Sequence, residues 1–296
     1  MKGIILAGGT GSRLYPSTFV TSKQLLPVYN KPMIYYPLST LMLAGIQDIL
    51  IISTPHDLPH FQALLGNGDK LGINLNYKEQ PVPKGIAQAF LIGEKFISQE
   101  PCALILGDNI FHGTGLIALL RDIVRKNNGA TIFGYYVEQP EQYGVIEFDR
   151  KNKIISIEEK PKVPKSNYAI PGLYFYDKHV CEYTKELKLS FRNELEITDL
   201  NYIYLKNNQL DVKILGRGYT WFDVGTHEGL FEASYFIKTI EENQDIIVAS
   251  PEVIAYRNGW IDASCLLSAS EKYGKSKYSQ YLEGLLSEVK ISNECN

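Results

Sequence analysis

Short β-rich runs alternate with helical patterns through the first 126 residues, and few folds accommodate this order of elements. The predicted strands are Gly3–Ala7, Asp48–Ser53, Leu75–Glu79 and Cys102–Leu106, and the predicted helices are Met33–Ala44, Pro59–Leu65, Ile86–Ile97 and Leu116–Lys126. This alternation predicts a Rossmann-like α/β fold, with a mostly parallel mixed sheet covered by helices on both faces. Such sheets bind ligands beyond the carboxyl ends of their strands, so the loops after the strands are candidate binding segments.

The second half of the chain has a different pattern. From Ala130 to Tyr176, β-runs are broken by turns, which is typical of an α+β portion. The later predicted elements are helices Lys178–Leu187 and Asp199–Lys206, a strand at Phe222–Gly225, a helix from Thr226 to about Glu241 and a helical segment from Ser250 to Val289. Since no repeat or low-complexity linker separates the parts, we predict one compact unit with a helical C-terminal appendage.

Composition excludes several classes of protein. The formal net charge is −3, with Lys and Arg spread along the chain, which predicts no nucleic-acid partner. No apolar run approaches the roughly 20 residues of a membrane-spanning helix, and the first apolar run is too short for a signal-peptide core. The four cysteines, Cys102, Cys181, Cys265 and Cys295, show neither disulfide nor zinc spacing. A cytoplasmic protein without a membrane partner is therefore predicted.

A glycine-rich loop follows the first predicted strand. Gly8, Gly9 and Gly11 allow the backbone to approach a ligand closely and to present N–H groups to an anion. Arg13 adds a planar fork for phosphate oxygens, and Lys23 adds a point charge. The loop matches neither the P-loop nor the dinucleotide fingerprint. Taken alone, the segment fits a phosphate site and a tight turn with a surface arginine equally well.

Two aspartates end apolar strands in matching contexts. Asp108 follows the strand Cys102–Leu106, and Asp223 lies in the strand Phe222–Gly225. Either one alone fits a helix cap, but two beside a phosphate loop favour a Mg²⁺ site, because Mg²⁺ prefers hard oxygen ligands completed by water and phosphate oxygens.

The segment from Gly8 to Leu14, followed by Lys-Gln-Leu-Leu-Pro at 23–27, resembles the signature of the sugar-phosphate nucleotidyltransferases, and matches extend over nearly the whole chain. The resemblance implies that the loop wraps a triphosphate and that Arg13 and Lys23 bind and activate its α and β phosphates. It also implies that Asp108 and Asp223 hold Mg²⁺. The nucleotide-binding residues implied are Leu6, Gly8, Gly9, Gly11, Gln24, Gln80 and Gly85, with Gln80 and the Gly85 backbone on a thymine base.

The same resemblance implies a sugar-phosphate site. Its residues are Tyr143, Gly144, Glu159, Lys160, Ile170 and Arg192, with Glu159 on sugar hydroxyls, Lys160 on the 1-phosphate and Arg192 as a second phosphate clamp. The implied catalytic set is Arg13, Lys23, Asp108, Lys160 and Asp223. The implied organisation is a catalytic domain at 1–241, with a nucleotide-binding part at about 1–130 and a sugar-binding part at about 131–241, and an oligomer-forming or regulatory appendage at 242–296.

Within the family, Lys-Gln-Leu-Leu-Pro, Glu-Ile-Thr-Asp and the C-terminal helices occur together in members that join dTTP and glucose 1-phosphate, the first step of a dTDP-rhamnose type of route. We therefore expect this reaction, by in-line attack of the sugar phosphate on the α-phosphorus. The alternatives are a uridylyl-, cytidylyl- or adenylyltransferase, or an inactive nucleotide-sensing subunit. The resemblance also implies a homotetramer with a regulatory nucleotide site, for which the nearest matches are Gly113, Arg217, Gly218 and Arg257.

Overall fold

The computed structural model describes residues 1–126, 128–151 and 153–294, without the side chains of 288–294. Its centre is one ten-stranded mixed sheet in the order β10-β9-β11-β8-β12-β6-β1-β4-β5, with β13 beside β8. Four neighbouring strands are parallel: β6 (Cys102–Leu106), β1 (Lys2–Ala7), β4 (Asp48–Ser53) and β5 (Asn74–Glu79). The strands predicted in the first 126 residues therefore form the parallel half of the sheet.

The other half of the sheet is mainly antiparallel. Its strands are β12 (Leu173–Tyr176), β8 (Ala130–Tyr136), β11 (Tyr168–Ala169), β9 (Gly144–Phe148), β10 (Ile154–Glu159) and β13 (Leu210–Leu215). β12 joins the two halves, because it pairs antiparallel with both β6 and β8. The turns that interrupt the β-runs after Ala130 make this antiparallel order possible, since antiparallel strands need only short connections.

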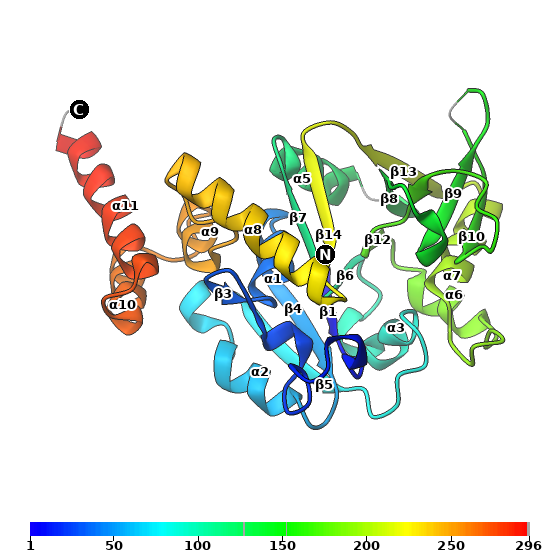
Figure 1. Cartoon of the computed structure of the whole chain (residues 1–296), viewed down its shortest axis with the longest axis horizontal. Helices are drawn as coiled ribbons and strands as arrows, with labels where there is room; N and C mark the ends of the chain where they lie inside the picture. The colour runs from blue at the N-terminus through cyan, green and yellow to red at the C-terminus, as the bar shows by residue number, and fades with distance from the viewer. Residues whose placement is uncertain (127, 152, 295–296) are drawn as a thin grey trace.

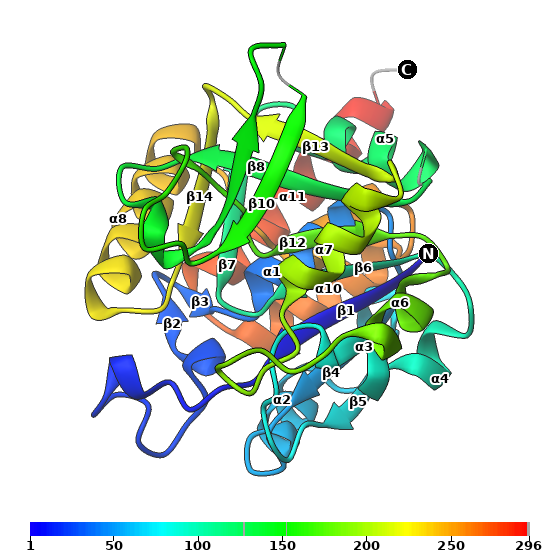
Figure 2. The ribbon, with the colours of Figure 1, turned by 90° about the vertical axis from the view of Figure 1, so that its right-hand side faces the viewer.

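Helices cover both faces of the sheet, which confirms the predicted α/β fold (Figures 1 and 2). One face packs against α1 (Tyr35–Leu43), α2 (Leu58–Leu65) and α5 (Leu116–Lys126), and the other against α3 (Gln88–Ile92), α6 (Val180–Glu186) and α7 (Ile197–Lys206). The alternation of side chains along β1 divides its residues between the faces: Ile5 belongs to the first core and Ile4 to the second. Both are fully buried.

The predicted helix at Ile86–Ile97 is interrupted. It forms α3 and a second short helix, α4 (Glu94–Ile97), which meet at Gly93. A Cβ atom on Gly93 would lie 3.2 Å from Leu50 and 3.3 Å from Ile4, so the chain passes close to the sheet at this point. The absence of a side chain at Gly93 permits this close approach, and helical periodicity alone does not reveal the interruption.

A two-stranded ribbon beside the main sheet joins distant parts of the chain. In it, β7 (Asn109–Gly113) pairs antiparallel with β14 (Tyr219–Asp223), in a register that places Asp223 opposite Asn109. The helix α8 (His227–Gln244) follows directly, and Thr226 caps it by accepting a 3.1 Å hydrogen bond from the amide of Gly229. The helix predicted from Thr226 is therefore confirmed, and the last predicted strand extends further back than its pattern indicates.

The C-terminal segment is helical, as predicted, and consists of three helices. They are α9 (Pro251–Arg257), α10 (Ala263–Tyr273) and α11 (Lys277–Glu294), and Figure 1 shows α10 and α11 at one end of the molecule. Among the described residues, no helix is long and apolar enough to cross a membrane. Of the four cysteines, Cys102, Cys181 and Cys265 are free thiols, whereas Cys295 lies outside the described residues.

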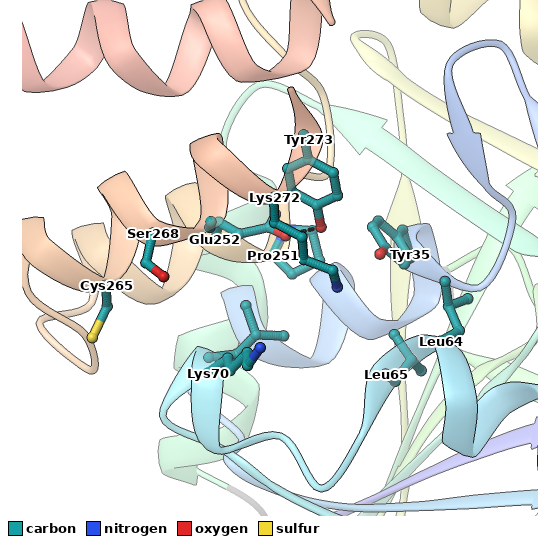
Figure 3. Close-up of a pocket in the computed structure, with 12 residues that line it drawn as sticks. Tyr35, Leu64, Leu65, Lys70, Pro251, Glu252, Cys265, Ser268, Lys272 and Tyr273 are labelled. Atoms are coloured by element: carbon teal, nitrogen blue, oxygen red, sulfur yellow. Dashed lines mark hydrogen bonds between the residues drawn. The ribbon is translucent and has the colours of Figure 1, made fainter. Parts of the chain in front are cut away.

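A buried carboxylate of α9 accepts hydrogen bonds from the two helices that follow it. Glu252 is 5% exposed and accepts hydrogen bonds from the hydroxyls of Tyr273 (2.6 Å), Tyr278 (2.5 Å) and Ser250 (3.2 Å). Figure 3 shows Glu252 and Tyr273 beside a cavity of about 170 Å³, which is lined on its other side by Leu64, Leu65 and Lys70. The C-terminal helices therefore dock through a polar network.

Replacing Glu252 by alanine is expected to lower the free energy of unfolding by about 2–3 kcal/mol, because it removes the buried carboxylate that accepts from the hydroxyls of Tyr273 and Tyr278. Urea titration measures this loss. Glu252→Gln keeps one acceptor oxygen and should lose less. A loss below about 0.5 kcal/mol for Glu252→Ala would show that the network does not stabilise the docking.

Candidate active site

The glycine-rich loop leaves β1 at the edge where the parallel strands end. Gly9 and Gly11 have positive φ angles of 94° and 61°, which L side chains rarely adopt. The loop is held at its far end by the buried side chain of Leu14 and by a 2.7 Å hydrogen bond from the Thr18 hydroxyl to the Gly11 carbonyl. A Cβ atom on Gly9 would meet nothing within 4 Å, so the loop is open to a ligand at this residue.

Lys23 and Asp108 are in direct contact although 85 residues separate them. The Lys23 ammonium donates to Asp108 Oδ2, and the side-chain Nδ2 of Asn109 donates to Asp108 Oδ1 at 3.2 Å. Asp108 follows β6 and is 7% exposed. The strand therefore places a carboxylate at the sheet edge, where a cation from the loop meets it.

Asp223 lies beside this pair. The amide of Val224 donates to the Asp108 carbonyl at 2.9 Å, so the backbones of the two aspartate segments are joined. Burial and, after it, the charge of Asp108 raise the pKa of Asp223 to about 6, although Lys23, Arg13 and Lys160 act in the opposite direction. All five residues predicted to be catalytic therefore lie within electrostatic reach of one carboxylate pair.

The two aspartates fit a Mg²⁺ site. Mg²⁺ is usually bound by one or two carboxylates, with water and phosphate oxygens completing its octahedron. Within the described ranges, no group of three or more His, Cys, Asp or Glu residues could hold a metal, so the donor set here is the aspartate pair. The mutual repulsion that raises the pKa of Asp223 is what a bound cation would relieve.

Several of the residues predicted to bind the nucleotide are also close together. Gln80 follows β5, is 3% exposed, and its Oε1 atom lies 2.7 Å from the position that a Cβ atom on Gly8 would occupy. Gln24 donates to the Gly8 carbonyl at 3.3 Å, and Leu6 lies near the end of β1. Gly85 has a φ of 92° and contacts the backbone of Leu195, where a Cβ atom would lie 2.4 Å from the carbonyl oxygen.

A second group gathers the residues predicted for the sugar phosphate. Gly144 lies next to Glu159 and Ile170, and the Ile170 amide donates to the Gly144 carbonyl at 2.8 Å. Lys160 has a φ of 44°, an uncommon backbone conformation that costs an L residue about 1–2 kcal/mol, and its amide donates to the Tyr143 carbonyl at 3.0 Å. Strain of this kind concentrates at functional sites.

Arg192 is held by carboxylates in the structure. Its guanidinium contacts Glu196 at 2.6 Å, Glu159 at 3.1 Å and Glu194 at 3.5 Å, and the nearest of these raises the pKa of Arg192. Thr198 also donates to Glu159. Arg192 therefore orients Glu159, which the sequence does not indicate; its contact with a phosphate remains a prediction.

Some residues of the site have no motif of their own. Asn109 Oδ1 accepts from the Trp221 indole at 2.7 Å and from the Gly172 amide at 2.9 Å, and so joins three segments. Trp221 stacks edge to face on Tyr143, beside a cavity of about 280 Å³ that Arg13 also lines. Their only signal in the sequence is their position next to Asp108 and Asp223.

The predicted regulatory residues fall beside a different cavity. Gly113 and Arg257 both line a cavity of about 400 Å³ between α1, β7, α5 and α9. Gly218 contacts Gly113, since a Cβ atom there would lie 2.6 Å from the Gly218 carbonyl oxygen. Arg217 belongs to the turn between β13 and β14. Their regulatory role is a prediction.

A phosphate-type loop and a carboxylate pair at the edge of a mixed α/β sheet define a nucleotide-processing enzyme. The family model for nucleotidyl transferases matches residues 2–240, and the chain belongs to this family.

Within it, the chain is similar to the glucose-1-phosphate thymidylyltransferase of Xanthomonas campestris pv. campestris (strain B100), at 57% identity over 284 residues that cover 96% of each chain. A crystal structure of a Bacillus anthracis protein assigned to the same group, in complex with a sucrose, is 42% identical, with a TM-score of 0.76, and covers 85% of this chain and 98% of that one. A UDP-glucose pyrophosphorylase complexed with UDP-glucose is 26% identical, with a TM-score of 0.71, and covers 80% of this chain and 98% of that one.

Proposed function

We propose that this chain transfers a thymidylyl group from dTTP to α-D-glucose 1-phosphate, giving dTDP-glucose and pyrophosphate. The observation that carries the proposal is the convergence of Arg13, Lys23 and Lys160 on the carboxylates of Asp108 and Asp223. The chain's similarity to thymidylyltransferases over nearly its whole length selects this reaction within the family. A place at the start of a dTDP-deoxysugar route of the rhamnose type belongs to the same proposal.

The reaction is a phosphoryl transfer without covalent catalysis. An oxygen of the sugar phosphate bonds to the α-phosphorus of dTTP, the bond from that phosphorus to the bridging oxygen breaks, and pyrophosphate leaves with the electron pair. Because the attacking phosphate is already ionised at neutral pH, no general base is needed. A Mg²⁺ ion held by Asp108 and Asp223 supplies charge neutralisation on the triphosphate when bound.

The chain's own residues bind and orient the two substrates. Gln80, Gly85, Gln24 and the loop at 6–11 hold the nucleotide. Arg13 and Lys23 neutralise charge that develops on the triphosphate as the bond breaks. Lys160 and Arg192 hold the 1-phosphate, while Glu159 accepts hydrogen bonds from sugar hydroxyls near Tyr143, Gly144 and Ile170.

We also propose the larger organisation. Residues 1–241 form the catalytic domain, with nucleotide and sugar portions that meet near residue 130, and 242–296 form an oligomer-forming or regulatory appendage. The chain works in the cytoplasm as a homotetramer, in which the cavity beside Gly113 and Arg257 takes a regulatory nucleotide. Sedimentation velocity with and without added dTDP sugars tests the assembly.

The direct test of the reaction is product analysis. Purified chain is incubated with dTTP, glucose 1-phosphate and Mg²⁺, and the products are separated by anion-exchange chromatography and identified by phosphorus NMR. We expect dTDP-glucose and pyrophosphate in equal amounts. A chain that binds dTTP without making either product would be a nucleotide sensor rather than an enzyme.

Arg13→Ala is expected to lower kcat about a hundredfold with little change in thermal stability, because the side chain is exposed and acts on charge that develops in the transition state. Arg13→Lys keeps the charge without the planar fork, so its kcat should lie between those of the wild type and Arg13→Ala. Arg150→Ala, also exposed and outside the site, is the matched control and should retain full activity. Equal losses of folding and of activity in Arg13→Ala would make Arg13 a structural residue.

A further inference from the structure

The side chain of Gln80 carries an ambiguity that matters for base selection. Its amide has an acceptor oxygen and a donor nitrogen of nearly the same shape, and which of them faces a base decides which base fits. In the structure the oxygen faces Gly8, at the start of the glycine-rich loop, and the nitrogen faces α3. With 3% exposure, Gln80 has little water nearby to compensate for a reversed amide.

Gln88, the first residue of α3, fixes this orientation. Its Oε1 atom accepts one hydrogen bond from the backbone amide of Lys84 and a second from Gln80 Nε2, each at 2.8 Å. The backbone N–H of Lys84 can only donate, so Gln88 must present its oxygen there. That oxygen can only accept, so Gln80 must present its nitrogen to it and its own oxygen to Gly8.

We propose that Gln88 is a positioning residue for base specificity: it holds Gln80 so that an acceptor oxygen faces the nucleotide and selects a pyrimidine imide. Thymine and uracil carry an N3–H donor, whereas N3 of cytosine is an acceptor that would meet the Gln80 oxygen as a like partner. Gln88 acts through Gln80 and does not touch the base. The inference rests on the proposed function, in which Gln80 contacts the base.

The physical reason for a large effect is the cost of unmatched polar groups. A site built to receive an N–H group rejects an analogue without it strongly, because buried acceptors are left unpaired. If Gln88 loses its oxygen, both orientations of the Gln80 amide become accessible, and the flipped form offers a donor that suits cytosine. Specificity between thymine and cytosine then falls while the remaining contacts to the nucleotide persist.

The test measures dissociation constants of dTTP, dUTP and dCTP by isothermal titration calorimetry in Mg²⁺ for four chains: wild type, Gln88→Met, Gln88→Glu and Lys84→Ala. We expect Gln88→Met, which keeps the length of the side chain but lacks the acceptor, to lower the dTTP-over-dCTP preference about tenfold. Gln88→Glu keeps an acceptor toward both donors and should keep the wild-type preference. Lys84→Ala keeps the backbone N–H and should do the same.

The dTTP-over-dUTP ratio separates this role from a general loosening of the site, because both bases carry the same imide. It should stay constant in every variant. An equal loss of affinity for all three nucleotides in Gln88→Met would make Gln88 merely structural and overturn the inference, as would a wild-type chain that binds dCTP as tightly as dTTP. Because binding is measured without turnover, a wild-type chain that discriminates between the bases but makes no dTDP-glucose would contradict the proposed function alone.

Discussion

Asp223→Asn is expected to lower kcat by about 10²–10³-fold, and chelation of divalent metal by EDTA should stop the wild-type reaction. Asparagine has the size of aspartate but lacks the charge that, beside Asp108, suits a divalent cation. Pyrophosphate release in a coupled assay measures both effects. Activity should return to the EDTA-treated wild type on addition of excess Mg²⁺, whereas Asp223→Asn should respond only weakly.

The same substitution should leave the metal-free fold intact or make it more stable. Burial and the charge of Asp108 raise the pKa of Asp223 to about 6, so ionising this carboxyl costs more free energy in the folded chain than in the unfolded chain. When the folded-state pKa of a carboxyl is raised, the free energy of unfolding of the protein falls as pH rises through that folded-state pKa. A neutral asparagine removes this loss. Thermal melts in EDTA at pH 7.5 test this expectation. A large drop in melting temperature would mean that Asp223 supports the fold.

Glu241→Ala is expected to lower the free energy of unfolding by about 3–5 kcal/mol, because it leaves the Lys31 ammonium buried without its ion-pair partner. The two side chains are 2% and 7% exposed, and Lys31 Nζ lies 2.9 Å from Glu241 Oε1. The Glu241 carboxylate also accepts from Asn30 at 2.6 Å and from the Val248 amide at 2.9 Å. Urea titration of the variant measures the loss.

Two controls separate the charge from the packing. Replacing both partners, in Lys31→Met with Glu241→Leu, should recover most of the stability, because an apolar pair leaves no charge unmatched. Burial already lowers the pKa of Lys31, while Glu241 raises it. Without Glu241, Lys31 binds its proton more readily in the unfolded chain than in the folded chain. The free energy of unfolding of Glu241→Ala should therefore rise as pH increases toward about 10. A pH-independent loss below about 1 kcal/mol would contradict a charged pair.

The parallel half of the fold could be predicted from sequence because three of its strands, β1, β4 and β6, are almost entirely buried and its helices are periodic. Helical periodicity alone does not reveal the interruption at Gly93, where the chain passes close to Leu50 and Ile4 of other strands. The pairing of β14 with β7 could not be predicted either, because β7 lies more than a hundred residues earlier in the chain. Long-range pairing leaves no local pattern.

The site shows the same division. Arg13, Lys23, Asp108 and Asp223 could be proposed because their residue types and positions after strands have a direct chemical meaning. Gln88 and Asn109 could not, because each acts by orienting another side chain. The contact of Arg192 with Glu159 is equally hidden, since it depends on how the segment before α7 approaches β10, whereas Glu194 and Glu196 are close to Arg192 in the sequence.

The central claim, nucleotidyl transfer to a sugar phosphate with thymine preference, is tested most directly by pyrophosphate release with glucose 1-phosphate, Mg²⁺ and each nucleoside triphosphate in turn. We expect fastest release with dTTP and none when EDTA is present or glucose 1-phosphate is omitted. Preference for another triphosphate would contradict the base assignment, and no release with any of them would contradict the assignment of an enzyme.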